Sequence, residues 1–193
     1  MKLFIEKHIK LSFDSSTAMI ECFRNLQVDY PKFFKMDNLS KLGFLASEML
    51  LKSSGISSQE SIDGREDVSV ICFNRSSSLE IDMQYQTTIQ DNDNYFPSPS
   101  LFVYTLPNIV AGEIAIRNKF YGETSFYVCE HFDAKQICRI VNNTFSDRLT
   151  TLALVAWVES LGNTHEIFMF LAKESGEEKM ILEENKLNEL YNK

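Results

Sequence analysis

Residues 94–137 have the sequence NYFPSPSLFVYTLPNIVAGEIAIRNKFYGETSFYVCEHFDAKQI, and this stretch says most about the fold. Pro97 and Pro99 fix an extended path in the loop at its start. Pro107 suits the first turn of a helix, where its missing N–H costs nothing. The residues that follow are apolar almost all round up to Arg117, which is typical of a deeply buried helix. The stretch therefore predicts a loop, a buried helix, a tight turn, a strand and a second helix.

Two glycines in this stretch carry separate expectations. Gly112 lies inside the predicted helix, where glycine costs about 1 kcal/mol of helix propensity relative to alanine. We therefore expect another backbone to pack closely against Gly112. Gly122 is expected to end the helix, and TSFYVC (124–129) then reads as a short buried strand.

Outside this stretch, hydrophobic periodicity predicts an alternation of strands and helices. Before it we expect a strand at 2–13, a helix capped by Asp37 or Asn38 and ended by Gly55, a loop at 56–66, a buried strand at 67–73 and a helix at 79–89. After it we expect a helix at 132–146, a strand in 148–160, a hairpin through Leu161, Gly162 and Asn163, a strand in 163–173, and a helical tail with Met180, Leu187 and Leu190 on one side. Residues 14–26 fit either a short helix or a loop. This order predicts an α/β layered fold, with one mixed, mainly parallel sheet between helices.

Length and composition limit the classes of function. The 193 residues suit one domain, with 44% hydrophobic and 24% charged residues. A net charge of −8 gives nucleic-acid binding little support, because phosphate contacts need clustered Lys and Arg. Glu6, Lys7 and Lys10 interrupt the N-terminal apolar residues, so we expect no signal peptide, no membrane span and a cytoplasmic protein.

The cysteines and histidines do not form a metal-binding motif. Cys22, Cys72, Cys129 and Cys138 show no C-x-x-C spacing, and His8, His131 and His165 lie far apart in the sequence. We expect free thiols that are mainly buried, and we expect neither a metal nor a cofactor.

Three stretches together resemble the N-terminal half of the β-ketoacyl-acyl-carrier-protein synthases, which have a thiolase-like fold. They are FFKMDNLSKLGFLASEMLLKSSGI (33–56), DVSVICF (67–73) and SPSLFVYTLPNIVAGEIAIRNKFYGETSFYV (98–128). The resemblance spans residues 30–172, and PNIVAGEIAI is its most specific part. It is closer still to short ketosynthase N-terminal-domain-like proteins of bacteria. Some of these accompany aryl-polyene pigment genes and are related to chain-length-factor subunits.

The resemblance implies an altered catalytic position. In the family, the strand after the second glycine leads to a nucleophilic cysteine at a helix N-terminus, and the equivalent position here is about His131. Cys129, two residues away, is a weaker alternative nucleophile, and the surrounding CEHFDA replaces the family's small residues. The family's catalytic histidines lie in a C-terminal half that we expect this chain to lack. The expected domains are a ketosynthase N-terminal-like domain at 1–174 and a helical tail at 175–193.

Three functions follow from the resemblance. The first is a non-catalytic partner, such as a chain-length-factor-like subunit in fatty-acid or aryl-polyene-type polyketide biosynthesis, that pairs with a ketosynthase or with itself. The family dimerises along the equivalent strand, so the interface candidates are Thr124, Ser125, Phe126, Tyr127 and Val128. A half fold should also expose the apolar face that its sister half covers.

The second function is catalytic: a 3-oxoacyl-acyl-carrier-protein synthase component that receives its histidines from a partner chain. Here Cys129 would be the nucleophile beside His131, against the simpler interpretation of Cys129 as a packed core thiol. The third function is a binding module for an acyl chain or an acyl carrier protein. Because carrier proteins are acidic, docking would need a basic patch, with candidates Lys32, Lys35, Lys41, Arg117 and Lys119.

Overall fold

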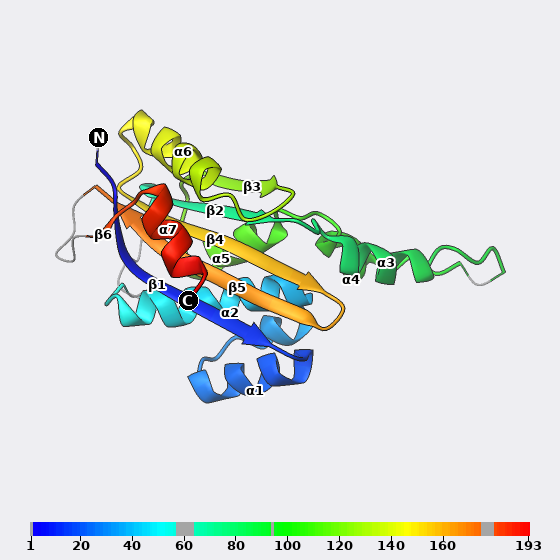
Figure 1. Ribbon diagram of the computed structural model, residues 1–193. Coiled ribbons are helices and arrows are strands. Elements are labelled where there is room, and N and C mark those ends of the chain that lie inside the picture. The colour runs from blue at the N-terminus through cyan, green and yellow to red at the C-terminus, as the bar shows by residue number, and fades with distance from the viewer. Residues whose placement is uncertain (1, 57–63, 94, 175–179) are drawn as a thin grey trace.

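A six-stranded mixed sheet runs through the molecule, with helices on both of its faces (Figure 1). The computed structural model describes residues 2–56, 64–93, 95–174 and 180–193. The strand order is β3-β2-β4-β5-β1-β6. Strands β3, β2 and β4 are parallel to one another, and β4, β5, β1 and β6 pair antiparallel. The expected α/β layered architecture with a mixed sheet between helices is confirmed.

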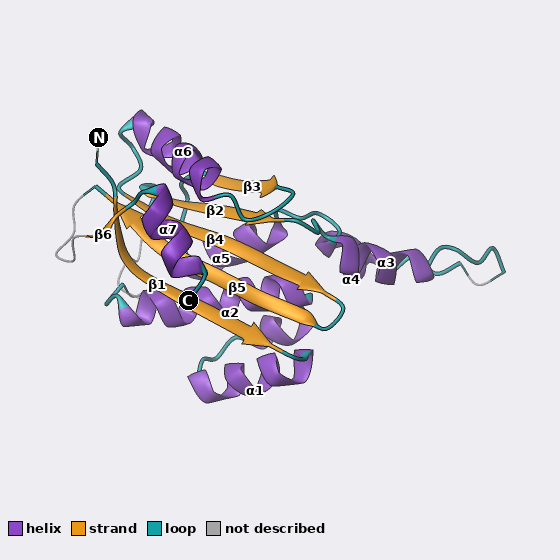
Figure 2. Ribbon diagram, viewed as in Figure 1, coloured by secondary structure: helices purple, strands orange, loops and turns teal. Residues whose placement is uncertain are grey.

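The elements follow one another in the order expected from the sequence, with a few additions (Figure 2). They are β1 (Phe4–Phe13), α1 (Ser16–Leu26), the 3-10 helix η1 (Pro31–Lys35), α2 (Asn38–Ser53), β2 (Val68–Asn74), α3 (Leu79–Thr87), α4 (Pro99–Tyr104), α5 (Ile109–Asn118), β3 (Thr124–Val128), α6 (Ala134–Thr144), the 3-10 helix η2 (Phe145–Asp147), β4 (Leu152–Leu161), β5 (Thr164–Lys173), β6 (Met180–Ile181) and α7 (Glu184–Tyr191).

The sheet separates two hydrophobic cores. Along β4, Leu152, Leu154, Ala156 and Val158 point into the core shared with α1, α2 and α5, and Ala153, Val155 and Trp157 point into the core shared with α6 and α7. Because successive side chains of a strand point to opposite faces, both sets are buried only when helices cover both faces. This double burial explains why the sequence of β4 is apolar without alternation.

Local signals in the sequence fix several element ends. Asp37 caps α2 by accepting a hydrogen bond from the Ser40 N–H at 3.1 Å. Gly55 follows that helix with a φ of +68°, a left-handed conformation that suits glycine. Gly162, with a φ of +62°, lies in the hairpin that joins β4 to β5 and sets Leu161 opposite Thr164. The ambiguous residues 14–26 form α1, which Ser15 caps through the Ala18 N–H.

The close helix contact occurs at Gly43 and not at Gly112. A Cβ added to Gly112 would have no neighbouring atom within 4 Å, so the expected packing of another backbone there is wrong. A Cβ added to Gly43 of α2 would lie 2.5 Å from Cγ2 of Val110 on α5. The glycine of α2, rather than that of α5, therefore allows the two helices to approach. Gly122 also packs closely, since a Cβ there would lie 2.4 Å from the Val68 carbonyl oxygen.

Four other expectations need correction. The residues after Pro99 form the short helix α4, and α5 ends at Asn118 with Lys119 in the left-handed conformation, before Gly122. Met180 lies in β6, opposite Ile5, and not on the tail helix. Of the four free cysteines only Cys72 is fully buried; the other three are partly exposed. The loop expected at 56–66 and the tail boundary at 174–175 fall largely on residues outside the described ones.

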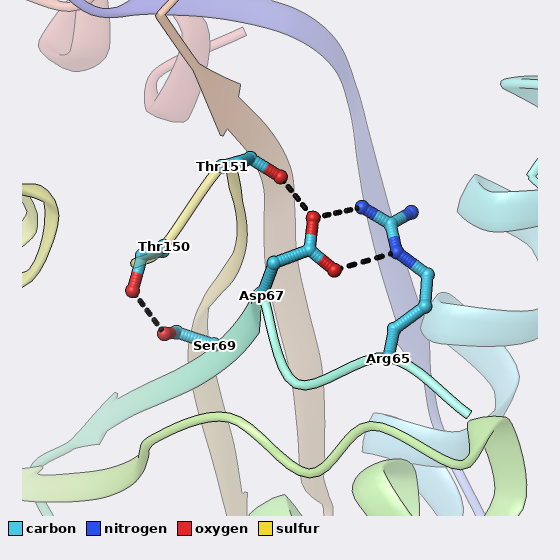
Figure 3. A network of polar contacts seen from close by, with 5 residues as sticks. All are labelled: Arg65, Asp67, Ser69, Thr150 and Thr151. Atoms are coloured by element: carbon cyan, nitrogen blue, oxygen red, sulfur yellow. Dashed lines mark hydrogen bonds and ion pairs between the residues drawn. The ribbon is translucent and has the colours of Figure 1, made fainter. Parts of the chain in front are cut away.

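A polar network joins the beginnings of β2 and β4 (Figure 3). Arg65 donates two hydrogen bonds to the Asp67 carboxylate, at 3.0 and 2.8 Å, and the Thr151 hydroxyl donates to the same group. Ser69 and Thr150 hydroxyls meet at 3.0 Å inside the sheet. These contacts hold together two strands whose connection includes β3 and five helical segments.

Among the described residues, no helix has the length and apolar character needed to cross a membrane.

Candidate functional site

A cavity of about 270 Å³ lies where the three parallel strands end. Arg75 follows β2, His131 follows β3, and Glu159 lies near the end of β4, and all three line the cavity. In open α/β sheets, ligands bind beyond the carboxyl ends of the strands. The position that the sequence resemblance matched to a nucleophile, His131, is therefore at the expected place for a site.

The environment of Cys129 works against a reactive thiolate. Cys129 directly follows β3, is partly exposed, and donates its N–H to the Asn74 carbonyl at 2.7 Å. Burial raises the pKa of the Cys129 thiol, and the nearby Asp133 carboxylate raises it further. Asp133 also caps α6, by accepting from the Gln136 N–H at 2.9 Å. A reactive cysteine needs a lowered pKa, so a capping carboxylate at this helix terminus has the opposite effect.

Aromatic side chains close one side of the cavity. Phe132, next to His131, stacks on Tyr191 of α7 with ring centroids 3.8 Å apart and planes 2° apart. Trp157 of β4 meets Phe132 edge-on at 5.8 Å. The helix α7 thus lies against the loop after β3, and Leu187 and Leu190 anchor it in the second core.

The lining of the cavity is acidic. Glu159 is buried and accepts hydrogen bonds from the Arg75 and Ser76 N–H groups and from the Ser76 hydroxyl. Glu166 of β5 stands directly opposite Glu159 in the antiparallel register, and Glu130 adds a third carboxylate to the lining. Burial and the charges of Glu166 and Glu159 raise the pKa of Tyr191. Acyl transfer needs donors aimed at a developing oxyanion, and carboxylates oppose that charge.

The strand β3 forms one edge of the sheet. Val70 of β2 donates to the Glu123 carbonyl, and Cys129 donates to the Asn74 carbonyl. Because alternate residues of a strand direct their backbone groups to the same side, Thr124, Phe126 and Val128 direct theirs away from β2. The edge carries no charged residue and no proline between 124 and 128, although both commonly protect natural edge strands.

A second surface feature is the arm, defined as α3, α4 and the described loop residues between and after them (79–93 and 95–106). The arm projects from one end of the sheet (Figure 1). Exposed apolar side chains gather on it: Leu79, Met83, Tyr95, Phe96, Phe102, Val103 and Leu106. Patches of this kind usually mark contacts with another molecule.

The faces of the sheet do not form such a patch. Within the described residues helices cover both faces, and the exposed positions of α6 are polar: Lys135, Arg139 and Asn143. The expectation that a half fold exposes an apolar face stays a prediction, since exposed apolar residues such as Ile116 of α5 lie on the covering helices and not on the sheet itself. Among the described residues, apolar side chains are exposed on the arm, at the β3 edge, where Val128 is 57% exposed, and at separate positions such as Ile116, Tyr121 and Leu149.

Of the basic residues considered for carrier-protein docking, two are held in ion pairs and one is buried. Lys32 pairs with the buried Glu113 at 2.7 Å. Arg117 donates to both carboxylate oxygens of Glu48, at 2.8 and 3.2 Å. Lys41 is buried, and Lys35 and Lys41 both line a second cavity, beside the first turns of α2. Within the described chain, no group of three or more His, Cys, Asp or Glu side chains is arranged to hold a metal ion.

Comparison with solved structures identifies the class of fold. The ishigamide ketosynthase/chain length factor matches 91% of this chain with a TM-score of 0.72 at 14% identity. A ketosynthase in complex with its chain length factor from Xenorhabdus doucetiae matches 91% with a TM-score of 0.62 at 13% identity. A beta-ketoacyl synthase from Burkholderia phymatum matches 90% with a TM-score of 0.64 at 15% identity. The chain therefore has a ketosynthase-like fold of the thiolase type, as the sequence resemblance implied.

The chain matches only part of the length of each of these solved structures. The chain spans 63% of the ishigamide protein, 80% of the Xenorhabdus chain and 59% of the Burkholderia chain. No family model and no curated protein matches the sequence.

Sequence reasoning did not identify several residues that shape these surfaces. Tyr191 was assigned to a tail with no link to His131, since only the folded chain brings residues 132 and 191 together. Nothing in the sequence indicated that Phe102 and Val103 are exposed, because apolar residues in a short helix give no sign of exposure. A signal for α4 was present: Pro99 at its first turn, after Ser98, which caps it through the Leu101 N–H.

Proposed function

We propose that the protein is a non-catalytic, chain-length-factor-like subunit that pairs with a ketosynthase or with a second copy of itself. The observation that carries the proposal is the outer side of β3, which is uncharged and has no strand partner among the described residues, next to an otherwise well-packed sheet. A strand from another chain could satisfy the outward backbone groups of Thr124, Phe126 and Val128 by extending the sheet. The exposed apolar side chains of the arm offer a further contact surface.

The fold supports a role in fatty-acid or polyketide biosynthesis of the aryl-polyene type. Solved structures of similar fold include one whose title describes a ketosynthase in complex with its chain length factor. The proposal transfers that kind of partnership to this chain.

The chemistry around His131 supports the non-catalytic form of the proposal. The nucleophile position holds histidine, the thiol of Cys129 has a raised pKa, and the adjoining cavity is lined by Glu130, Glu159 and Glu166. The alternative of a catalytic component that works with a partner chain would need a thiolate at this point. Lys32 and Arg117 already form ion pairs with Glu113 and Glu48. These contacts do not favour the alternative of a carrier-protein binding module.

The test is the state of association of the purified chain, alone and after co-expression with a candidate ketosynthase partner. We expect a dimer, or a stable complex with the ketosynthase, in size-exclusion chromatography with light scattering. The Val128→Lys variant places a charge on the β3 edge and should weaken association by tenfold or more, or about 1.4 kcal/mol.

Ile181→Lys is the matched control, because Ile181 is also exposed but lies on β6 at the opposite edge of the sheet. This variant should associate like the wild type. A chain that stays monomeric and does not bind the ketosynthase would refute the proposal. Equal effects of the two substitutions would refute the assignment of β3 as the interface.

A further inference from the structure

A second cavity, separate from the one at His131, lies under the base of the arm. It encloses about 150 Å³ between the first turns of α2 and the helices α3 and α4. Its lining includes Lys41 of α2, Glu80 of α3 and Ser160 at the end of β4. The residues lining the two cavities do not overlap.

The feature that sets this cavity apart is a lysine whose side chain is buried while its ammonium group is accessible from the cavity. The Lys41 side chain lines the cavity, and the residue is only 8% exposed. Within the part of the chain that the structure describes, its Nζ makes no hydrogen bond and no ion pair. Buried charges in proteins are normally paired, because an uncompensated charge loses the stabilisation that water gave it.

The two nearest carboxylates are held by other partners. Glu80 accepts from the Asn38 side-chain amide at 2.9 Å through one oxygen and from the Ser160 hydroxyl at 2.7 Å through the other. The Ser160 hydroxyl is itself fixed by Nδ1 of the buried His165 at 3.0 Å. Both oxygens of Glu80 thus have fixed partners, and the carboxylate cannot turn to Lys41 without breaking this chain.

The Asp37 carboxylate also has another partner, because it caps the N-terminus of α2. Its carboxylate accepts the Ser40 N–H at 3.1 Å, and burial raises its pKa. Burial also lowers the pKa of Lys41, while the charges of Asp37 and Glu80 act in the opposite direction. The ammonium therefore has two acidic neighbours but no direct contact with either.

We propose that this cavity binds the carboxylate group of a short organic monoacid, with Lys41 as its ion-pair partner. The remaining walls suit a small molecule with an apolar part: Leu39, Ile81 and Leu101 offer hydrocarbon, and Ser77 and Gln84 offer polar groups. The volume admits only a few heavy atoms beyond the carboxylate. A dianion such as phosphate is disfavoured, because Asp37 and Glu80 lie close to the single ammonium.

The experiment uses the full chain and three probes: butyrate, its neutral analogue butyramide, and inorganic phosphate. Isothermal titration should show saturable binding of butyrate, with at least tenfold weaker binding of butyramide and of phosphate. In NMR spectra of the labelled chain, butyrate should shift amide signals of residues 36–41 and 77–81. Phosphate binding at the strength of butyrate, or shifts confined to other residues, would overturn the proposal.

Two variants separate the role of Lys41 from a general charge effect. Lys41→Met should abolish butyrate binding, and it should raise the melting temperature of the ligand-free chain because it removes a partly desolvated charge that has no direct partner. Lys52→Met, which removes an exposed lysine from the end of the same helix, should leave both quantities unchanged. Unaltered butyrate binding in Lys41→Met would refute the proposal, and so would a lower melting temperature of that variant. The result does not depend on whether β3 forms an interface.

Discussion

At the scale of single residues, Asp67 has the clearest electrostatic role outside the two cavities. Its carboxylate accepts two hydrogen bonds from Arg65 and one from the Thr151 hydroxyl, where β2 and β4 begin (Figure 3). The hydrogen bonds from Arg65 are the main cause that lowers the pKa of Asp67 from 3.8 to about 2. A charged Asp67 therefore stabilises the folded chain.

This pKa predicts the pH range in which the network acts. Because the folded pKa lies below the ordinary value, the contribution is complete above pH 4 and is lost as the pH falls towards about 2. Asp67→Asn should lower the free energy of unfolding at neutral pH by about 1 kcal/mol, since solvent screens this partly exposed pair. Thermal melts from pH 7 to pH 2 should show the gap to the wild type narrowing below pH 4. A gap of constant size would contradict the role of Asp67, and Glu66→Gln is the control for loss of a neighbouring charge.

Residue types at the candidate site were readable from the sequence, but their surroundings were not. The resemblance placed His131 at the nucleophile position, and the structure locates it at the end of a parallel strand, beside a cavity. The carboxylate that helps to raise the pKa of Cys129 belongs to Asp133, which caps α6. The ring that stacks on Phe132 belongs to Tyr191 of α7. Such contacts depend on how distant segments pack, which periodicity in a single sequence does not specify. Whether the site is non-catalytic stays a prediction.

At the scale of elements, the contact between α2 and α5 depends on Gly43. The absence of a Cβ there leaves room for Val110, whose branched side chain has little freedom to move aside. Gly112 on α5 has open space around it, and so gives up helix propensity without any gain in packing.

These two glycines should respond to alanine in opposite directions. Gly43→Ala should destabilise the fold by about 1–3 kcal/mol, because the new methyl group clashes with Val110. Gly112→Ala should stabilise it by about 0.5–1 kcal/mol, through improved helix propensity alone. Urea unfolding curves measure both changes. The same sign for both variants would contradict the assignment of the close contact to Gly43.

Most elements were predictable because their signals are local. Alternation gave β1, capping by Asp37 gave α2, and continuous apolar runs gave β2 and β4. The exceptions have physical reasons. The helix α4 has only six residues, too few for a clear period, and the two residues of β6 form a strand only because β1 is beside them.

At the scale of the whole molecule, the sheet joins two cores that are each built from distant parts of the chain. The second core includes Leu3, just before β1, and Ile5 of β1, together with Leu187 and Leu190 from α7. The proposed boundary between a domain at 1–174 and a tail at 175–193 thus separates segments that share one core.

This shared core predicts that α7 unfolds together with the sheet. Leu187 is fully buried, so Leu187→Ala should cost about 2–5 kcal/mol, or a fall in melting temperature of roughly 5–15 °C. Circular dichroism and tyrosine fluorescence should report one transition at the same temperature. Asn185→Ala, at an exposed position of the same helix, is the control. A separate early transition confined to α7 would show that the tail is an independent unit.

The position of β1 in the sheet affects how the chain is made. Phe4 pairs with Lys173 on one side and with Ile181 on the other, so both strands that pair with β1 in the described part of the chain come from the last part of the sequence (Figure 1). A ribosome adds about 5–20 residues each second, so on the order of ten to thirty seconds separate the synthesis of β1 from that of its partners. During this interval β1 is a nascent strand with both edges open. The fold thus creates a specific period in which a ribosome-associated chaperone would have a substrate.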